Sequence, residues 1–252
     1  MTHFYNKWWN TFHQNLEPFF LFIKKYLQGF LHLLFPSICL QCGTDELSDS
    51  NILCDSCIQQ LPYTDFFSIE NNVVEKMFWG RISLGACGAA LFFTKKSIVQ
   101  ILIFELKYKQ NPKAGWLLGR LMGEALQKSN RFHHINGLVP VPLQKSRQRK
   151  RGYNQAQLLC EGIAAVCHWP LFKNSIQKKK TSSSQTHKDR LQRGGSATIQ
   201  FTITHPETLY GLNLLVVDDV VTTGATMEAL GHCLLMAQPA SIGFAAAAYT
   251  LH

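Results

Sequence analysis

The chain has 252 residues, of which 46% are hydrophobic and only 16% are charged. This length can bury a large core, and it fits one large domain together with a small one. Basic residues outnumber acidic residues by 25 to 16, and the resulting net charge of +9 favours an acidic partner such as a phosphorylated metabolite, a nucleic acid or an anionic membrane. No run of about 18 uninterrupted apolar residues occurs and no cleavable signal pattern is seen, so we expect no transmembrane span. The eight cysteines do not form a disulfide framework, so we expect a protein of the reducing cytoplasm.

The N-terminal extension, residues 1–35, predicts an amphipathic helix. Apolar side chains recur at spacings of three and four residues from Leu16 to Leu34, with Lys24 and Lys25 mostly on the opposite side. Packing onto the protein's own domain is the commoner use of such a stripe. Docking on a membrane surface or on a partner protein is the alternative.

A small module over residues 36–65 carries two Cys-x-x-Cys pairs. Four thiolates on such a short stretch can surround one tetrahedral zinc ion, and we expect the metal ligands to be Cys39, Cys42, Cys54 and Cys57. Because cysteine fills all four positions, the zinc would be structural. A redox pair or free thiols are the alternatives. The other four of the eight cysteines lie in apolar segments, where we expect buried free thiols.

The third part, residues 84–252, alternates predicted strands with predicted helices. Strands are expected over residues 84–93, 137–142, 169–176, 199–203, 214–217 and 242–249, and helices over residues 98–108, 116–128 and 154–166. Ser97 is the expected N-cap of the first helix. This alternation indicates an α/β fold with a mostly parallel sheet flanked by helices. Residues 62–81 give a weak signal and are interpreted as a linker and irregular structure.

An acid pair followed by a small polar loop is the strongest site signal. Asp218 and Asp219 follow the apolar run 214–217, and the loop then opens a helical pattern. Ligands of open α/β sheets bind beyond the carboxyl ends of strands, where the N–H groups of a helix start favour an anion. The acids suit sugar hydroxyls or a divalent cation. This stretch therefore predicts a binding site for a phosphorylated sugar. The phosphate group would be bound by Thr222, Thr223, Gly224, Ala225 and Thr226.

Two basic segments are candidates for further anion contacts. A basic loop containing Arg147, Arg151 and Gly152 lies between a predicted strand and a predicted helix. A second stretch, residues 178–194, contains Lys188 and Arg190 and has hardly any apolar side chains. It suits a lid that closes over a bound polyanion, or a solvated arm. Either charge run, taken alone, also fits a nucleic-acid-binding face.

Five motifs, which occur in a characteristic order along the chain, resemble those of a known family. The loop at residues 216–226 resembles the phosphoribosyl pyrophosphate (PRPP) signature of type I phosphoribosyltransferases. Together with residues 53–62, 105–108, 139–143 and 151–156, it resembles the ComF family of competence-associated proteins. The resemblance covers roughly residues 36–250. It implies a type I phosphoribosyltransferase-like fold preceded by a small zinc-ribbon-like module.

The resemblance also implies roles for particular residues. Asp218 and Asp219 would contact the ribose hydroxyls, directly or through Mg²⁺, and residues 222–226 would hold the 5′-phosphate. Arg147, Arg151 and Gly152 would lie where family members bind pyrophosphate, and residues 178–194 would form the lid. Lys107 is a further candidate, although its place at a helix end does not by itself aim it at a ligand.

Two departures from related patterns narrow the function. Purine-salvage relatives often carry an acid at the position of Thr222, and a threonine cannot transfer a proton at neutral pH, so purine salvage is disfavoured. Many ComF relatives have further Cys-x-x-Cys pairs, whereas this chain has none between Leu61 and Cys87, so one zinc is expected.

Two functions follow from these expectations. The first is a PRPP-binding protein that acts in DNA uptake and natural transformation, with single-stranded DNA and DNA-uptake proteins as partners. The second is an active Mg²⁺-dependent phosphoribosyltransferase of nucleotide metabolism whose acceptor the sequence does not name. A P-loop ATPase is a poor alternative because no G-x-x-x-x-G-K-[S/T] motif occurs.

Overall fold

The computed structural model describes residues 37–47, 51–178 and 201–251. The chain divides into two compact units, Met1–Cys57 and Ile58–His252. The predicted N-terminal helix and most of the predicted lid, including Lys188 and Arg190, lie outside the described residues. Within those residues, no helix is long and apolar enough to cross a membrane.

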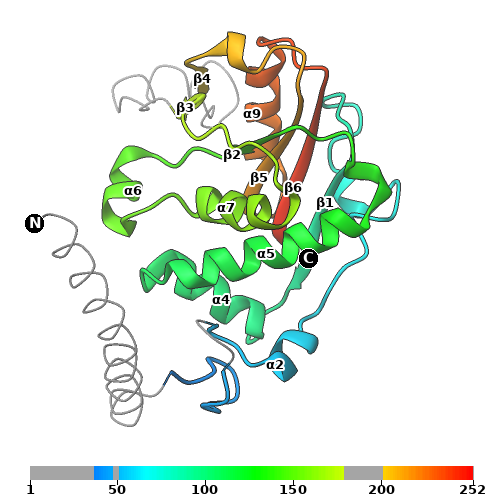
Figure 1. The fold of residues 1–252 in the computed structure, drawn as a ribbon. Helices are drawn as coiled ribbons and strands as arrows, with labels where there is room; N and C mark the ends of the chain where they lie inside the picture. Colours follow the sequence, from blue (N-terminus) through cyan, green and yellow to red (C-terminus); the bar gives the residue numbers. More distant parts are fainter. Residues whose placement is uncertain (1–36, 48–50, 179–200, 252) are drawn as a thin grey trace, which may run out of the picture. The chain divides into compact units, whose positions relative to one another are not determined.

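A four-stranded sheet forms the centre of the larger unit (Figure 1). All three neighbouring pairs are parallel, and the spatial order is β1 (Cys87–Phe93), β6 (Ser241–Thr250), β5 (Asn213–Val221) and β2 (Gly137–Pro140). The two central strands are nearly continuous runs of buried apolar residues, as expected for a parallel sheet covered on both faces. The expected fold class is confirmed.

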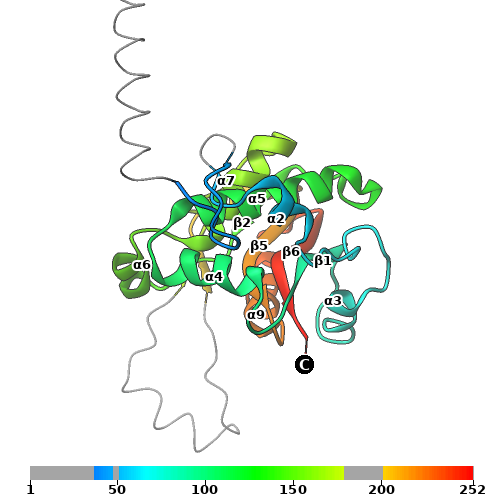
Figure 2. The same ribbon diagram turned by 90° about the horizontal axis from the view of Figure 1, so that it is seen from below.

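Helices cover both faces of this sheet (Figure 2). One face carries α5 (Pro112–Lys128) and α7 (Gln155–Cys167), the other carries α9 (Ala225–Leu235), and α4 (Ile98–Tyr108) contacts α5 and β1. Helices α5 and α7 approach closely because they meet at glycines. A Cβ atom on Gly119 would lie 2.3 Å from the carbonyl oxygen of Leu159, so alanine does not fit there.

A two-stranded antiparallel ribbon corrects one predicted strand. The ribbon pairs β3 (Ile176–Lys178) with β4 (Phe201–Ile203), and the described part of the predicted strand 199–203 is therefore a strand. The prediction over residues 169–176 is wrong, because Leu171 makes only an isolated bridge to Leu138. Pro170 has no N–H group to donate, and the chain turns before Ile176, so a regular ladder cannot form there.

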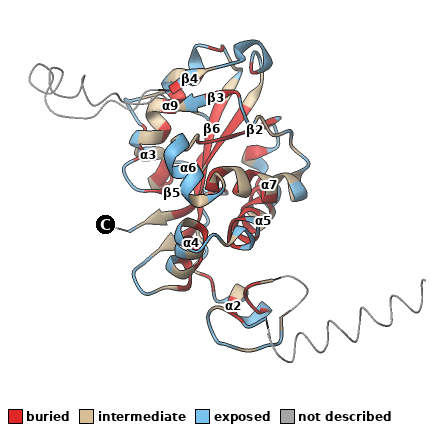
Figure 3. Cartoon of the chain, turned by 90° about the vertical axis from the view of Figure 1, so that its left-hand side faces the viewer, coloured by how far each residue is buried: buried red, intermediate tan, exposed pale blue. Residues whose placement is uncertain are grey.

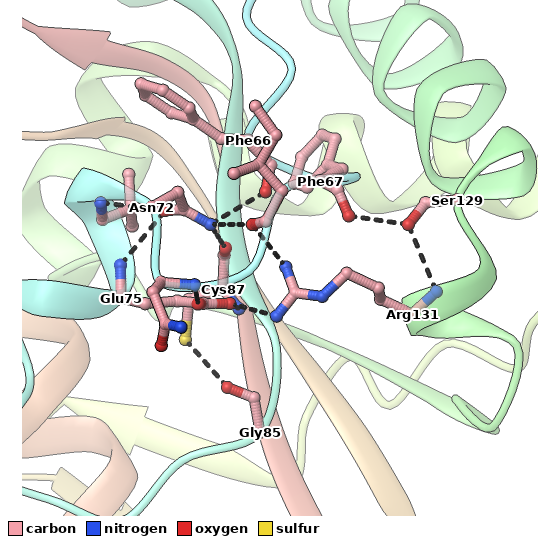
Figure 4. A network of polar contacts seen from close by, with 11 residues as sticks. Phe66, Phe67, Asn72, Glu75, Gly85, Cys87, Ser129 and Arg131 are labelled. Atoms are coloured by element: carbon pink, nitrogen blue, oxygen red, sulfur yellow. Dashed lines mark hydrogen bonds and ion pairs between the residues drawn. The ribbon is translucent and has the colours of Figure 1, made fainter.

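Residues 62–81 are mostly irregular, as expected from the sequence, but they belong to the larger unit and are not a linker. They include α3 (Val73–Lys76) and bury Phe67, Val74 and Phe78. Figure 4 shows the polar network that fixes the segment. The Asn72 amide donates to the carbonyl groups of Phe66, Ile69 and Cys87.

The second half of this network comes from distant residues. Glu75 accepts the N–H of Cys87 and pairs with Arg131, which lies 56 positions along the chain in the 3₁₀-helix η1 (Asn130–Phe132). The Ser129 hydroxyl donates to the carbonyl group of Phe67. Because these partners are remote in sequence, local patterns gave little sign of them. The pattern Asn72-x-x-Glu75 was a usable signal, since Asn72 caps α3.

Three short elements complete the described chain. They are α2 (Asp55–Gln59), α6 (Lys145–Arg151) and the 3₁₀-helix η2 (Pro206–Thr208). The expected basic loop is thus largely a helix, and this corrects the prediction. Its Lys, Arg and Gln residues are good helix formers, and Gly152 ends the helix in the left-handed conformation, with φ of 82°. No residue of α6 is buried (Figure 3).

Candidate functional site

The acid pair lies inside the last part of β5 and not beyond its end. Asp218 pairs in register with Ala246, and the ladder continues to Val221 opposite Tyr249. The strand is longer than expected because β6 supplies a small apolar run, residues 245–248, that keeps pairing with it. Since neighbouring strand residues point to opposite faces, the two carboxylates have different surroundings.

Lys107 reaches the acid pair from the last turn of α4. Its ammonium nitrogen lies 2.8 Å from a carboxylate oxygen of Asp219, and both side chains are mostly buried. This is the contact that a helix-end position alone did not predict. The ion pair neutralises one of the two carboxylates in the ligand-free protein.

The surroundings of Asp218 disfavour the charged form of its carboxyl group. Burial, and then the neighbouring Asp219 carboxylate, raise the pKa of Asp218 from 3.8 to about 7, although Lys107 and Lys178 oppose the shift. The carboxylate also accepts the N–H of Asp219 at 2.8 Å. Such a shift is common where a binding or catalytic site is built.

Lys178, at the end of β3, belongs to the same constellation. Burial, and then the nearby Arg147 guanidinium, lower the pKa of Lys178, whereas Asp218 raises it. Lys178 therefore repels Arg147 and attracts Asp218. The sequence placed Lys178 only in the general lid region and did not single it out. Its position on a strand became clear once the ribbon was known.

The predicted phosphate loop closes the carboxyl end of β5. Gly224 has φ of 72°, a left-handed conformation that favours glycine, and it stands at the N-cap of α9. Because glycine has no side chain, Gly224 cannot cap the first turn of α9 with a hydrogen bond. The Thr223 hydroxyl accepts the N–H of Ala225 at 3.5 Å. A helix of 11 residues thus opens towards this loop with its positive end.

Two residues that the sequence analysis did not name as site residues, Phe78 and Arg81, contact the backbone of this loop. A Cβ atom on Gly224 would lie 2.7 Å from the Phe78 ring, so the ring sets the path of the backbone there. The Arg81 guanidinium donates to the carbonyl groups of Met77 and Thr223, at 2.9 and 3.4 Å, and pairs with Glu228 of α9. Both residues come from the segment interpreted as a linker.

Four side chains form what we call the aromatic–basic surface, namely the exposed Phe104, Tyr108 and Lys109 and the half-buried Arg151. The Phe104 and Tyr108 rings lie 5.2 Å apart, and both are well exposed, Tyr108 at 65%. Lys109 lies over the Phe104 ring, and Arg151 of α6 lies over the Tyr108 ring at 5.7 Å. Tyr108 follows Lys107 directly, so one turn of α4 serves both this surface and the acid pair.

A hollow of about 250 Å³ lies apart from the acid pair, with Trp79, Glu75 and Arg131 among its lining residues. Two of its three charged lining residues, Glu75 and Arg131, already pair with each other in the network of Figure 4. A role in holding residues 66–87 accounts for them.

The four predicted zinc ligands converge within the smaller unit. The sulfur atoms of Cys39, Cys42, Cys54 and Cys57 all lie within 4.8 Å of one another. The Cys42 and Cys54 sulfurs are 3.7 Å apart, which matches the separation of roughly 3.8 Å that two thiolates have on a tetrahedral zinc with Zn–S bonds of about 2.3 Å. The cluster is compatible with a structural metal such as zinc.

Backbone donors favour a thiolate at Cys39 in this cluster. Burial raises the pKa of Cys39, but N–H groups including those of Cys42 and Cys54 outweigh it and lower the pKa to about 6. Cys57 shows the opposite balance, because burial and the neighbouring sulfurs raise its pKa to about 12. Four thiols this close cannot all ionise without a cation, and zinc would supply that charge.

The sequence of this chain is similar to a known domain family and to several known proteins. Residues 159–252, which contain β5, the loop and α9, match the family described as "Phosphoribosyl transferase domain". Over 204 residues the chain is 26% identical to "DNA utilization protein YhgH" of Salmonella typhimurium, covering 79% of this chain and 78% of that protein. "Competence protein F" of Haemophilus influenzae is 28% identical over 78% of this chain and 77% of its own length.

The chain is similar over most of its length to proteins of the ComF/YhgH family. A further ComF/YhgH relative, "Competence protein ComFC" of Bacillus subtilis, is 38% identical over 98 residues, but this match spans only 39% of the chain and 38% of the relative. Among solved structures, the glutamine PRPP amidotransferase of B. subtilis, complexed with ADP and GMP, matches with a TM-score of 0.39 and 14% identity over 57% of this chain and 30% of that one.

Proposed function

We propose that this chain binds PRPP together with Mg²⁺ in the cytoplasm and acts in DNA uptake and natural transformation. One observation carries the ligand assignment. The acid pair of β5 and the Gly224 turn of α9 join a site for a sugar or cation to a site for a phosphate within nine residues. The lysines and Arg147 around them supply the charge that a pyrophosphate needs.

The carboxylates of Asp218 and Asp219 fit Mg²⁺, which prefers hard oxygen ligands. In the absence of ligand, Lys107 occupies Asp219 at 2.8 Å, so Mg²⁺ or a ribose hydroxyl has to share or replace this contact. When bound, Mg²⁺ would offset the charge of the pyrophosphate. The chain's own residues orient the sugar at the acid pair, hold the 5′-phosphate at residues 222–226, and leave Lys107 beside the ligand.

Calorimetry with PRPP and Mg²⁺ tests this proposal. We expect Asp218→Asn and Thr226→Val each to weaken PRPP binding about tenfold or more, because each removes a charged or hydroxyl partner of the ligand. Glu207→Gln, at an exposed position in η2, is the matched control and should bind like the wild type. Unchanged affinity in both site variants would exclude the site.

An active transferase is the enzymatic alternative. The same arrangement could position PRPP for transfer to an acceptor, with the pyrophosphate stabilised by Arg147, Arg151 and Lys178. Thr222 provides no proton transfer at neutral pH, so the arrangement supports binding more directly than chemistry. Release of inorganic pyrophosphate upon incubation with candidate bases would favour the enzyme.

The aromatic–basic surface favours single-stranded DNA as a second ligand. Exposed aromatic rings that alternate with basic side chains suit such a strand, because bases stack on rings while cations contact phosphates. The Tyr108 ring with Arg151 across it is an arrangement of this kind. The names of the relatives, a DNA utilization protein and competence proteins, agree with this ligand.

A further inference from the structure

The ion pair between Arg81 and Glu228 lies at the N-terminal end of α9. One guanidinium nitrogen of Arg81 pairs with the Glu228 carboxylate, and the other donates to the carbonyl group of Thr223 at 3.4 Å. Because both nitrogens belong to one planar group, the Glu228 carboxylate lies close to the Thr223–Gly224 peptide. An acidic side chain therefore lies beside the loop that is proposed to bind a phosphate.

This acidic side chain suits the ligand-free helix but opposes an anionic ligand. Glu228 is in the first turn of α9, where a carboxylate interacts favourably with the positive end of the helix dipole. A phosphate uses the same positive end, and the like charge of an unpaired Glu228 would repel it. Arg81 offsets this charge, so the end of α9 stays attractive to an anion.

The loop beside the ion pair is accessible to a ligand, whereas the guanidinium is already engaged. Thr222, Thr223 and Ala225 are exposed. The Arg81 guanidinium bonds the carbonyl groups of Met77 and Thr223 as well as the carboxylate of α9. These three contacts favour a role in which Arg81 acts on the ligand through its neighbours.

A purely structural role is the simpler alternative, since Arg81 links residues 62–81 to α9. Other contacts already fix this segment, however. Phe78 packs against Phe244 of β6 with ring centroids 5.0 Å apart, and the network of Figure 4 holds the residues before it. The Arg81 side chain is 39% exposed, and ion pairs as exposed as this contribute little to stability.

We infer that Arg81 is a positioning residue for the phosphate loop, residues 222–226, because it neutralises Glu228 and keeps the N-terminal end of α9 attractive to the 5′-phosphate of PRPP. This inference rests on the proposed function and adds to it a residue that acts through others. It assigns the segment before β1 a part in ligand binding.

Calorimetry with Mg²⁺ tests the inference, with ribose 5-phosphate and PRPP as ligands. We expect Arg81→Gln to bind both about tenfold more weakly at low salt, because the Glu228 charge is then unpaired, and to lose less affinity at high salt, where charges are screened. Glu228→Gln should bind at least as tightly as the wild type. The double variant, which combines both substitutions, should recover most of the lost affinity.

Arg120→Gln is the matched control. Arg120 pairs with Glu124 on α5, and its side chain is 41% exposed, close to the 39% of Arg81. The control removes the same charge from a similar ion pair on another helix. Both affinities should therefore be unchanged, and the comparison separates a local effect from the loss of one positive charge.

Two results would overturn the inference and leave the proposed function standing. One is equal affinity for ribose 5-phosphate in the wild type and Arg81→Gln. The other is a double variant that binds as weakly as Arg81→Gln, with a lowered melting temperature in both, because the loss would then come from the packing of the segment and not from the Glu228 charge. Failure of the wild type to bind either ligand would overturn the proposed function as well.

Discussion

Asp218 binds a proton more tightly in the folded chain than it would in the unfolded chain. Its pKa rises from 3.8 to about 7, mainly through burial and then through Asp219. Between about pH 4 and pH 7 the folded state therefore holds more protons than the unfolded state. The free energy of unfolding then falls as pH rises through this range, and above pH 7 the full penalty remains.

Removing this carboxylate should stabilise the ligand-free protein at high pH. We expect Asp218→Asn to raise the free energy of unfolding by on the order of 2 kcal/mol at pH 8, and by almost nothing near pH 4, where the wild-type carboxyl is protonated. Urea denaturation at both pH values without Mg²⁺ measures this. Asp65→Asn, at an exposed position, is the control. A stabilisation that is equal at both pH values would contradict the explanation.

At the scale of single residues, the sequence marked the acid pair, the Gly224 turn and Lys107 as candidates, but it did not predict which distant residues contact one another. Lys107 and Asp219 are 112 positions apart, and only the packing of α4 against the sheet brings them together. Arg81 and Glu228 are 147 positions apart. Contacts between residues so far apart in the chain produce no local sequence pattern from which they could be predicted. A motif therefore identifies a site more readily than the residues that complete it.

Elements with strong end signals agreed best with expectation. Helix α4 runs from Ile98 to Tyr108 as predicted, because Ser97 caps it and apolar residues repeat at helical spacing. Helix α6 was predicted as a loop because its charge suggested a ligand contact and its helix-forming residues were overlooked. Residues 62–81 were missed because remote hydrogen bonds, and not periodicity, hold them in place.

Helices α4 and α6 together present the aromatic–basic surface, so the DNA prediction belongs to this pair of elements. We expect Tyr108→Ala to weaken binding of a fluorescent oligo-dT by about fivefold or more, since stacking contributes roughly 1–3 kcal/mol per base. Arg151→Ala should lower both the affinity and its dependence on salt. Fluorescence anisotropy over a salt series measures both effects.

Tyr210→Ala is the matched control for that experiment. Tyr210 is 67% exposed, as Tyr108 is 65% exposed, but it lies outside the aromatic–basic surface. Its replacement should leave the affinity for oligo-dT unchanged. Equal losses in Tyr108→Ala and Tyr210→Ala would argue against this surface as the DNA site.

At the scale of the whole molecule, the two compact units depend on different sources of stability. The larger unit buries a continuous apolar core around β5 and β6. In the smaller unit the four-cysteine cluster is the main described feature. A segment this short rarely builds a sufficient core, and a structural metal can contribute about 10–16 kcal/mol of apparent binding energy.

Metal removal should therefore affect the smaller unit first. We expect elemental analysis to find about one zinc per chain, since four thiolates fill one tetrahedral site. Cys54→Ser should lower this content, and chelation should open residues 37–57 to proteolysis while the larger unit stays resistant. Cys167→Ser should keep its zinc. Protein without zinc that resists proteolysis throughout would refute a metal-stabilised module.

The contact of Phe78 and Arg81 with the back of the Gly224 turn has a practical consequence for dissecting this chain. A fragment cut at residue 84, where the alternation of strands and helices begins, would retain the acid pair and the whole turn. It would lose the ring behind Gly224 and the guanidinium on the Thr223 carbonyl group. Such a fragment could contain every ligand-facing residue and still fail to bind. A fragment that starts at Ile58 keeps Phe78 and Arg81 together with the Gly224 turn. Ligand binding should therefore be measured on this longer fragment.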